Sequence, residues 1–116
     1  MPKTSPFEIV YAECISEHLD AIESKHLSLI RNTIEAQLRF EPQIQTRNRK
    51  PLEKPIVVGA TWELRFGPNN RFRVLYDVHL TEKQVVVLAI GVKIRNDLWL
   101  GKERVGNYEN RTLGSS

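Results

Sequence analysis

The chain has 116 residues, of which 41% are hydrophobic and 27% are charged, and this size and composition predict one globular domain spanning residues 1–116. No stretch approaches the ~20 apolar residues of a membrane-spanning helix, and the first residues lack a secretory signal, so we expect a cytoplasmic protein without a membrane partner. One cysteine and three histidines exclude an internal disulfide and a structural zinc site.

The basic charge is concentrated in the later part of the chain. Residues 1–44 contain 4 Lys and Arg against 7 Asp and Glu, whereas residues 45–116 contain 13 against 7, so the two parts carry net charges of −3 and +6. A concentrated positive charge favours phosphates and acidic proteins as partners. It is equally compatible with a lysine- and arginine-rich surface that only keeps the protein soluble.

The first part of the chain predicts a short strand and two helices. Residues 7–13 follow a proline and are rich in β-branched and aromatic residues, which is typical of a strand. Apolar residues then recur at intervals of three and four, as on amphipathic helices, and Pro42 ends the second helix near Phe40. The predicted apolar stripe consists of Ile15, Leu19, Ile22, Leu27, Ile30, Ile34 and Leu38.

The second part predicts a long connection and then a β-meander. Residues 41–55 contain three prolines and a basic run without periodicity, which indicates an exposed connection. Three strand-like segments follow at 60–66, 71–80 and 84–92, and the short turns between them favour antiparallel pairing.

The last of these segments is apolar at every position from Val85 to Ile90, as expected for a central strand that is covered on both faces. The amphipathic helices must bury their stripe against the sheet, so we predict an α+β fold of two layers. The core should span about residues 6–105, with residues 106–116 as a flexible tail.

Strand alternation brings charged residues together in the predicted meander. Glu63 and Arg65 share one face of their strand, opposite the apolar residues 62, 64 and 66, and Arg71 and Arg73 share the corresponding face of the next strand, opposite Phe72. The pattern predicts a cleft around Glu63 that is formed by Arg65, Arg71, Arg73, Lys93 and Arg95. Converging arginines suit a phosphodiester, but the same residues are also typical of the solvated face of an antiparallel sheet.

Other reactive side chains give weaker signals. The histidines have no partner at metal-ligand or catalytic spacing, and Cys14 is expected to be a small buried residue. Trp99 stands among polar residues, where it can stack on a base or pack against the protein.

The order and spacing of these strands resemble the RelE/ParE superfamily of toxins from type II toxin–antitoxin systems. The resemblance rests on Trp62-Glu63-Leu64-Arg65-Phe66-Gly67, on Arg71-Phe72-Arg73-Val74-Leu75-Tyr76-Asp77-Val78 and on Val87-Leu88-Ala89-Ile90-Gly91, with Arg49-Lys50-Pro51-Leu52 upstream. It implies a RelE-like fold, with a two-helix hairpin packed on a mainly antiparallel sheet, and a cognate antitoxin protein as the neutralising partner.

The resemblance to RelE-like members implies a metal-independent endoribonuclease that needs no cofactor and cuts mRNA on the ribosome, which inhibits translation. By position it assigns catalytic roles to Arg65, Arg73, Arg95 and Glu63, and RNA-binding roles to Arg71, Lys93, Trp99, Arg49 and Lys50. Two residues depart from the RelE-like pattern, since Glu63 stands where a lysine can stand and Trp99 replaces a tyrosine.

Two other functions fit the same resemblance. ParE-like members inhibit DNA gyrase by binding it and perform no chemistry, and an inactive relative would only bind the antitoxin. The resemblance favours RNA cleavage, because the arginines fall at the positions that RelE-like nucleases use.

Overall fold

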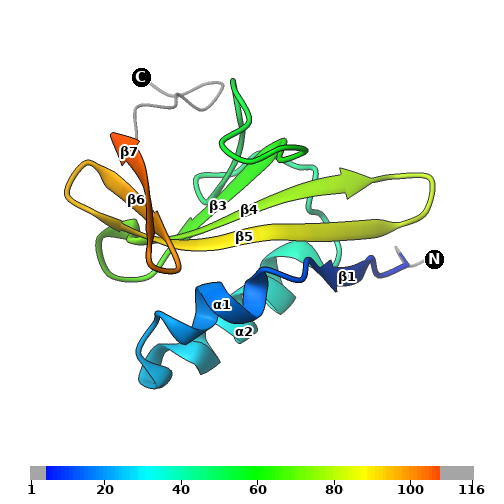
Figure 1. Cartoon of the computed structure of the whole chain (residues 1–116). Helices are drawn as coiled ribbons and strands as arrows, with labels where there is room; N and C mark the ends of the chain where they lie inside the picture. Colours follow the sequence, from blue (N-terminus) through cyan, green and yellow to red (C-terminus); the bar gives the residue numbers. More distant parts are fainter. Residues whose placement is uncertain (1–4, 108–116) are drawn as a thin grey trace.

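The computed structural model describes residues 5–107 and has an α+β architecture. Its helices are α1 (Ile15–Asp20), η1 (Ser24–His26), α2 (Leu27–Leu38) and η2 (Pro68–Asn70), and its strands are β1 (Glu8–Tyr11), β2 (Arg49–Pro51), β3 (Trp62–Phe66), β4 (Phe72–His79), β5 (Gln84–Ile94), β6 (Asp97–Leu100) and β7 (Glu103–Asn107). The strands form a 7-stranded sheet in the order β2-β3-β4-β5-β6-β7, with β1 paired to β5. Figure 1 shows α1 and α2 together on one side of this sheet.

The predicted N-terminal strand and both predicted helices are present. Strand β1 runs parallel to the first half of β5, and the buried Phe7 just before it donates its N–H to the carbonyl of Arg39 over 2.7 Å. Helix α2 ends at Leu38, before the proline that excludes further helical hydrogen bonds. The stripe faces the sheet as predicted, with Ile15, Ile22, Ile30, Ile34 and Leu38 buried.

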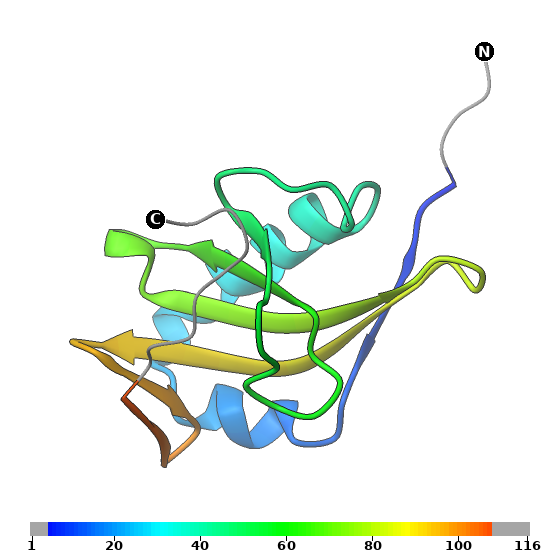
Figure 2. The same ribbon diagram turned by 90° about the horizontal axis from the view of Figure 1, so that it is seen from above.

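The predicted meander is confirmed as β3, β4 and β5, which pair in antiparallel order. Strand β5 is central, because it pairs with β1, β4 and β6, and Figure 2 shows it crossing the middle of the sheet. The pairing of β4 with β5 shifts between Leu75, which faces Ala89, and Tyr76, which faces Val87. Because of this bulge, Leu88 of β5 has no cross-strand partner residue on β4.

The sheet is apolar on both faces. The helices cover a core that includes Leu64, Val74, Tyr76 and Val87. On the opposite face lies another buried cluster, which consists of Leu52, Ala60, Leu75, Ala89, Leu98 and Leu100. The prediction that the central strand is covered on both faces is therefore confirmed. The alternative of a solvated face beyond the helices is wrong for the centre of the sheet, where β6 and the segment from 52 to 60 contribute apolar side chains.

Three short strands were not predicted. Strand β2 lies inside the segment that was expected to be an exposed connection, and it pairs with β3. Strands β6 and β7 form a hairpin beyond the last predicted strand, where the sequence turns polar. Strand β7 includes Gly106 and Asn107, which were assigned to the tail, and residues 108–116 lie outside the described residues. Within the described part of the chain, no helix is long and apolar enough to span a membrane.

Gly91 allows β6 to pack closely against β5. A Cβ at this position would lie 2.6 Å from Leu100 Cδ2 and 2.7 Å from the carbonyl oxygen of Trp99. We expect Gly91→Ala to lower the free energy of unfolding by about 1–3 kcal/mol, the usual cost of overpacking a core. Urea denaturation measures this loss, and an unchanged midpoint would show that β6 moves away without cost.

Candidate anion-binding site

The predicted arginine cleft divides into two separate groups in the structure. Arg65 and Arg73 are direct neighbours across β3 and β4, as strand alternation predicts, and both contact Glu63. Arg71, Lys93 and Arg95 instead meet at another place, beside the η2 turn. The expectation of one cleft around Glu63 is therefore wrong.

Glu63, Arg65 and Arg73 form a buried ion cluster. The Glu63 side chain is completely buried, and its Oε1 accepts a hydrogen bond from Arg65 Nε over 2.6 Å. Its Oε2 accepts one from Arg73 Nη1 over 3.4 Å, and Arg73 Nε donates to the carbonyl of Asn70 over 2.8 Å. Burial lowers the pKa of Arg73, and the charge of Glu63 opposes this shift. Both carboxylate oxygens are thus engaged, which leaves Glu63 unsuited to remove a proton from a substrate in this conformation.

The sequence pattern predicts that the two basic residues of β2, Arg49 and Lys50, are exposed, and the structure shows that they are not. Arg49 is buried, and its Nη1 donates to the carbonyl and to Oε1 of Gln37 over 2.8 and 2.9 Å. Its Nε donates to the carbonyl of Ile44 over 2.9 Å, so Arg49 ties β2 to the end of α2. Lys50 is half-buried and pairs with Glu63 across the strands.

Arg71 points to the helical side of the sheet and not to the same side as Arg73. It precedes β4 and has helical backbone angles, with φ −77° and ψ −21°, so strand alternation does not apply to it. Its Nη2 lies 2.8 Å from His26 Nε2, and its guanidinium carbon lies 5.0 Å from the centre of the Phe72 ring. Because arginine only donates, His26 Nε2 is the acceptor of this hydrogen bond.

Arg71, Lys93 and Arg95 line a hollow of about 290 Å³ together with Pro68 and Asn69, which we call the cationic hollow. Lys93 lies near the end of β5, and Arg95 lies in the β5–β6 turn with a positive φ of 60°. Among residues 5–107, none of these three cations has a carboxylate oxygen within 4.0 Å, which is the distance limit for an ion pair. The hollow therefore has a concentrated positive charge that an anion would neutralise.

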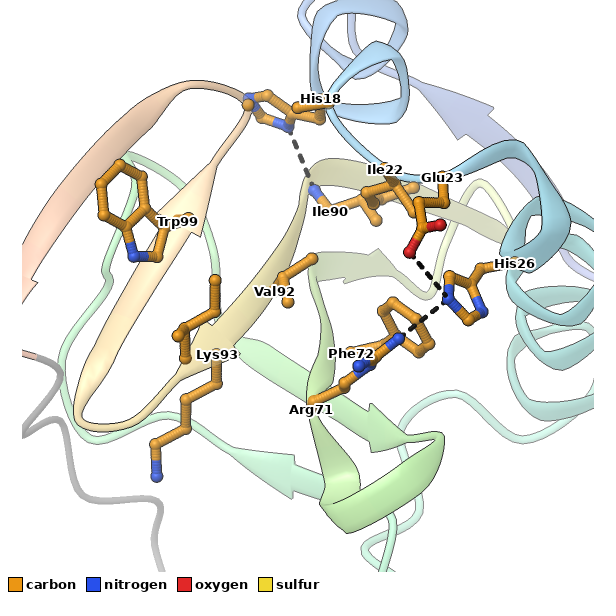
Figure 3. A pocket seen from close by; sticks show the side chains of 13 residues that line it. His18, Ile22, Glu23, His26, Arg71, Phe72, Ile90, Val92, Lys93 and Trp99 are labelled. Carbon is orange, nitrogen blue, oxygen red and sulfur yellow. Dashed lines mark hydrogen bonds and ion pairs between the residues drawn. The ribbon is translucent and has the colours of Figure 1, made fainter.

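A larger hollow of about 410 Å³, which we call the helix-side hollow, lies beside the cationic one and shares Arg71 and Lys93 with it. Figure 3 shows Trp99 on one side of it and His26 with Glu23 on the other, with Val92 between them. Trp99 is half-buried, so part of its ring remains accessible. The helix-side hollow has a mainly apolar lining that includes Ile22, Phe72, Ile90 and Val92.

His18 has a structural role that its position in the sequence does not reveal. Its side chain is buried, and its Nδ1 accepts a hydrogen bond from the backbone N–H of Ile90, two residues beyond the bulge in β5, over 3.1 Å. Burial lowers the pKa of His18, although Glu17 and Glu103 partly oppose the shift. Only the neutral ring can accept this bond.

The stability of the protein should therefore fall in mild acid. The unfolded chain takes up a proton at His18 near pH ~6.5, whereas the folded chain does so only at lower pH. Stability due to His18 is complete above that pH and is lost as the pH falls below it. We expect His18→Asn, which keeps an acceptor but does not titrate, to lose less stability than the wild type between pH ~7.5 and ~5.5. Equal losses in thermal denaturation would contradict this role.

Cys14 is exposed and donates from Sγ to the carbonyl of Leu88 over 3.2 Å, so the expectation of a buried residue is wrong. In the part of the chain that the structure describes, no group of three or more His, Cys, Asp and Glu residues could hold a metal ion.

The comparison with solved structures identifies a similar fold. The chain superposes on a chain of the crystal structure of the toxin–antitoxin complex RelBE2 from Mycobacterium tuberculosis, with a TM-score of 0.61 and 19% sequence identity. The match covers 80% of this chain and 98% of that chain. No protein family and no curated protein matches the sequence. The structure thus supports the predicted RelE-like fold.

Proposed function

We propose that this chain is the toxin of a type II toxin–antitoxin module and cuts mRNA on the ribosome. The observation that carries the proposal is the cationic hollow, where Arg71, just before β4, meets Lys93 and Arg95, at the end of β5 and in the turn after it. Several cations around one small hollow suit the oxygens of a phosphodiester. The fold shared with a chain of a toxin–antitoxin complex supports the same function.

In the proposed reaction, the RNA 2′-oxygen forms a bond to the adjacent phosphorus and the bond to the 5′-oxygen breaks. The products are a 2′,3′-cyclic phosphate and a free 5′-hydroxyl, and the proton that the 5′-oxygen takes up replaces the one that the 2′-hydroxyl gives up. Negative charge grows on the phosphorane oxygens, and Arg71, Lys93 and Arg95 would stabilise it by donating hydrogen bonds. This assignment keeps Arg95 in a catalytic role and gives the phosphate contact to Arg71, whereas the resemblance implies that Arg73 holds the phosphate.

Glu63, Arg65 and Arg73 would then support the site. Their ion cluster joins β3 to β4, and the Arg73 bond to Asn70 holds the turn that precedes Arg71. Both oxygens of Glu63 are bound by arginines, so Glu63 is not assigned as the general base. A group of the ribosome would instead remove the proton of the 2′-hydroxyl, and the ribosome would thereby complete the site.

The proposed antitoxin would be acidic. The residues from 45 onward carry a net charge of +6, and the cationic hollow has no carboxylate at ion-pair distance among the described residues. An anionic segment laid over the hollow would neutralise this charge and block RNA.

Mapping of mRNA 5′ ends after brief induction of the chain tests the proposed function. We expect new ends within codons at the ribosomal A site, together with growth arrest. DNA damage without new mRNA ends would contradict RNA cleavage and indicate gyrase inhibition instead, and the absence of both would indicate an inactive antitoxin-binding protein.

A further inference from the structure

We propose that His26 is a positioning residue of the candidate site, which holds the Arg71 guanidinium in place for an anion in the cationic hollow. The inference rests on the proposed function and deepens it, because it adds a residue of the helical layer that acts on the phosphate through Arg71. It is carried by one contact, in which Arg71 Nη2 donates a hydrogen bond to His26 Nε2 over 2.8 Å. Figure 3 shows this contact on one side of the helix-side hollow.

The orientation of Arg71 depends on this hydrogen bond. Among residues 5–107, His26 Nε2 is the one acceptor that is bonded to the Arg71 guanidinium, and Arg71 Nε is buried without a hydrogen-bond partner. Arg73, in contrast, is held by Glu63 and by the carbonyl of Asn70. An arginine side chain has many rotamers, so the loss of its acceptor would let the Arg71 guanidinium occupy several positions.

His26 is itself held firmly in the fold. It is the last residue of η1, its backbone N–H donates to the carbonyl of Glu23 over 3.0 Å, and its side chain is only 18% exposed. Its ring centre lies 5.2 Å from that of Phe72, and the guanidinium carbon of Arg71 lies 5.0 Å from the same Phe72 ring. The imidazole and the guanidinium therefore pack on a common apolar support from β4.

The neighbouring charges leave this contact in place. Glu23 Oε1 lies 3.9 Å from His26 Nε2, which is beyond hydrogen-bonding distance, and Lys25 Nζ lies 3.9 Å from the other oxygen of Glu23. The bond to His26 uses one of the five N–H groups of the Arg71 guanidinium. Arg71 also lines the cationic hollow, so its other N–H groups can donate to an anion there while His26 holds the guanidinium.

Two substitutions at position 26 separate the acceptor from the rest of the side chain. His26→Leu removes the acceptor, whereas His26→Gln places an amide oxygen near the position of Nε2. In single-turnover cleavage of mRNA on the ribosome, we expect His26→Leu to be about ten- to a hundredfold slower than the wild type, as for a misplaced reacting group, and His26→Gln to retain most of the rate. Equal rates in the two folded variants, or a wild-type rate in His26→Leu, would overturn the proposal.

A matched control and a second variant exclude a general loss of folding. His79→Leu removes a histidine of β4 that is bonded to Asp77 over 3.1 Å and lines neither hollow, so it should cleave like the wild type. If His26→Leu unfolds at a clearly lower temperature than the wild type, His26→Phe takes its place, because it keeps a ring against Phe72 and has no acceptor. The expected rate and the contradicting outcome are then the same.

Nuclear magnetic resonance of the full ¹⁵N-labelled chain gives a readout that does not depend on cleavage. The Nε–H of Arg71 is buried and should exchange slowly with water, so its signal should differ from those of exposed arginines, and Arg71→Lys identifies it by its loss. We expect this signal to persist in His26→Gln and to disappear or move to the position of exposed arginines in His26→Leu. An unchanged signal in His26→Leu would overturn the proposal.

The two proposals fail in different ways. If induction leaves mRNA uncut but the Arg71 signal depends on an acceptor at position 26, His26 still fixes Arg71 and the proposed nuclease is wrong. If mRNA is cut and His26→Leu cuts it like the wild type, the positioning role is wrong and the proposed nuclease stands.

Discussion

The double variant Arg71→Ala, Arg95→Ala is expected to lose growth arrest and to lower mRNA cleavage on the ribosome at least a hundredfold. Both guanidinium groups line the cationic hollow, where the proposed reaction accumulates charge on the phosphate oxygens. Removing one donor that is aimed at such charge usually costs ~10²–10³ in rate. Arg95 is exposed and Arg71 is half-buried, so most of the effect should fall on activity and not on folding.

Arg47→Ala is the matched control for this variant. Arg47 is an exposed arginine in the loop before β2, and it lines neither the cationic nor the helix-side hollow. We expect it to retain growth arrest and the same pattern of mRNA ends. The double variant must unfold at nearly the wild-type temperature for the comparison to hold. Full growth arrest by a double variant that folds would contradict the proposed function.

The arrangement of the main elements follows from local patterns in the sequence. The apolar stripe at helical spacing, the uniformly apolar segment from Val85 to Ile90 and the short turns predict the helices, the central strand and the meander, all of which are present. These patterns suffice because each element must bury one face, or two, against its neighbours. The cross-strand pairing of Arg65 with Arg73 follows from the same alternation.

The environment of the arginines could not be predicted from alternation alone. Leu98 and Leu100, which help to cover the face beyond the helices, come from β6, a strand of only four residues between two polar turns. Such coverage depends on contacts between distant parts of the chain. Arg71 departs from the pattern for a local reason, because the η2 turn gives it helical backbone angles and turns it toward His26.

The roles of the histidines depend on tertiary contacts that leave no signal in the sequence. His18 meets the backbone of Ile90, 72 residues later, and His26 meets Arg71, 45 residues later. Spacing between histidines therefore revealed neither role. A polar residue at the edge of an apolar helix stripe, as His18 is beside Ile15 and Ile22, is the one local feature that fits a buried histidine.

Glu63→Ala is expected to destabilise the fold more than any other substitution of a charged residue considered above. It would leave the guanidinium of Arg73, itself almost fully buried, without the carboxylate that faces it. Removing one partner of a buried ion pair usually lowers the free energy of unfolding by ~3–5 kcal/mol, because an uncompensated charge remains inside. Urea denaturation of the purified chain measures the loss.

Asp97→Ala provides the matched control, since it removes a carboxylate from the exposed pair with Arg104, whose atoms lie 3.3 Å apart. An exposed pair contributes ~1 kcal/mol or less, so this variant should unfold close to the wild type. Equal destabilisation by Glu63→Ala and Asp97→Ala would show that the buried cluster is unimportant for folding.

Replacing both partners separates a structural role from a chemical one. In the variant Glu63→Leu, Arg73→Met, no buried charge of the pair remains, and apolar replacement of a whole ion pair is often neutral for stability. If this variant folds and still arrests growth, the cluster only supports the site. If it folds and is inactive, the reaction depends on this pair, either through the turn that Arg73 holds at Asn70 or through the direct role that the resemblance to RelE-like toxins implies.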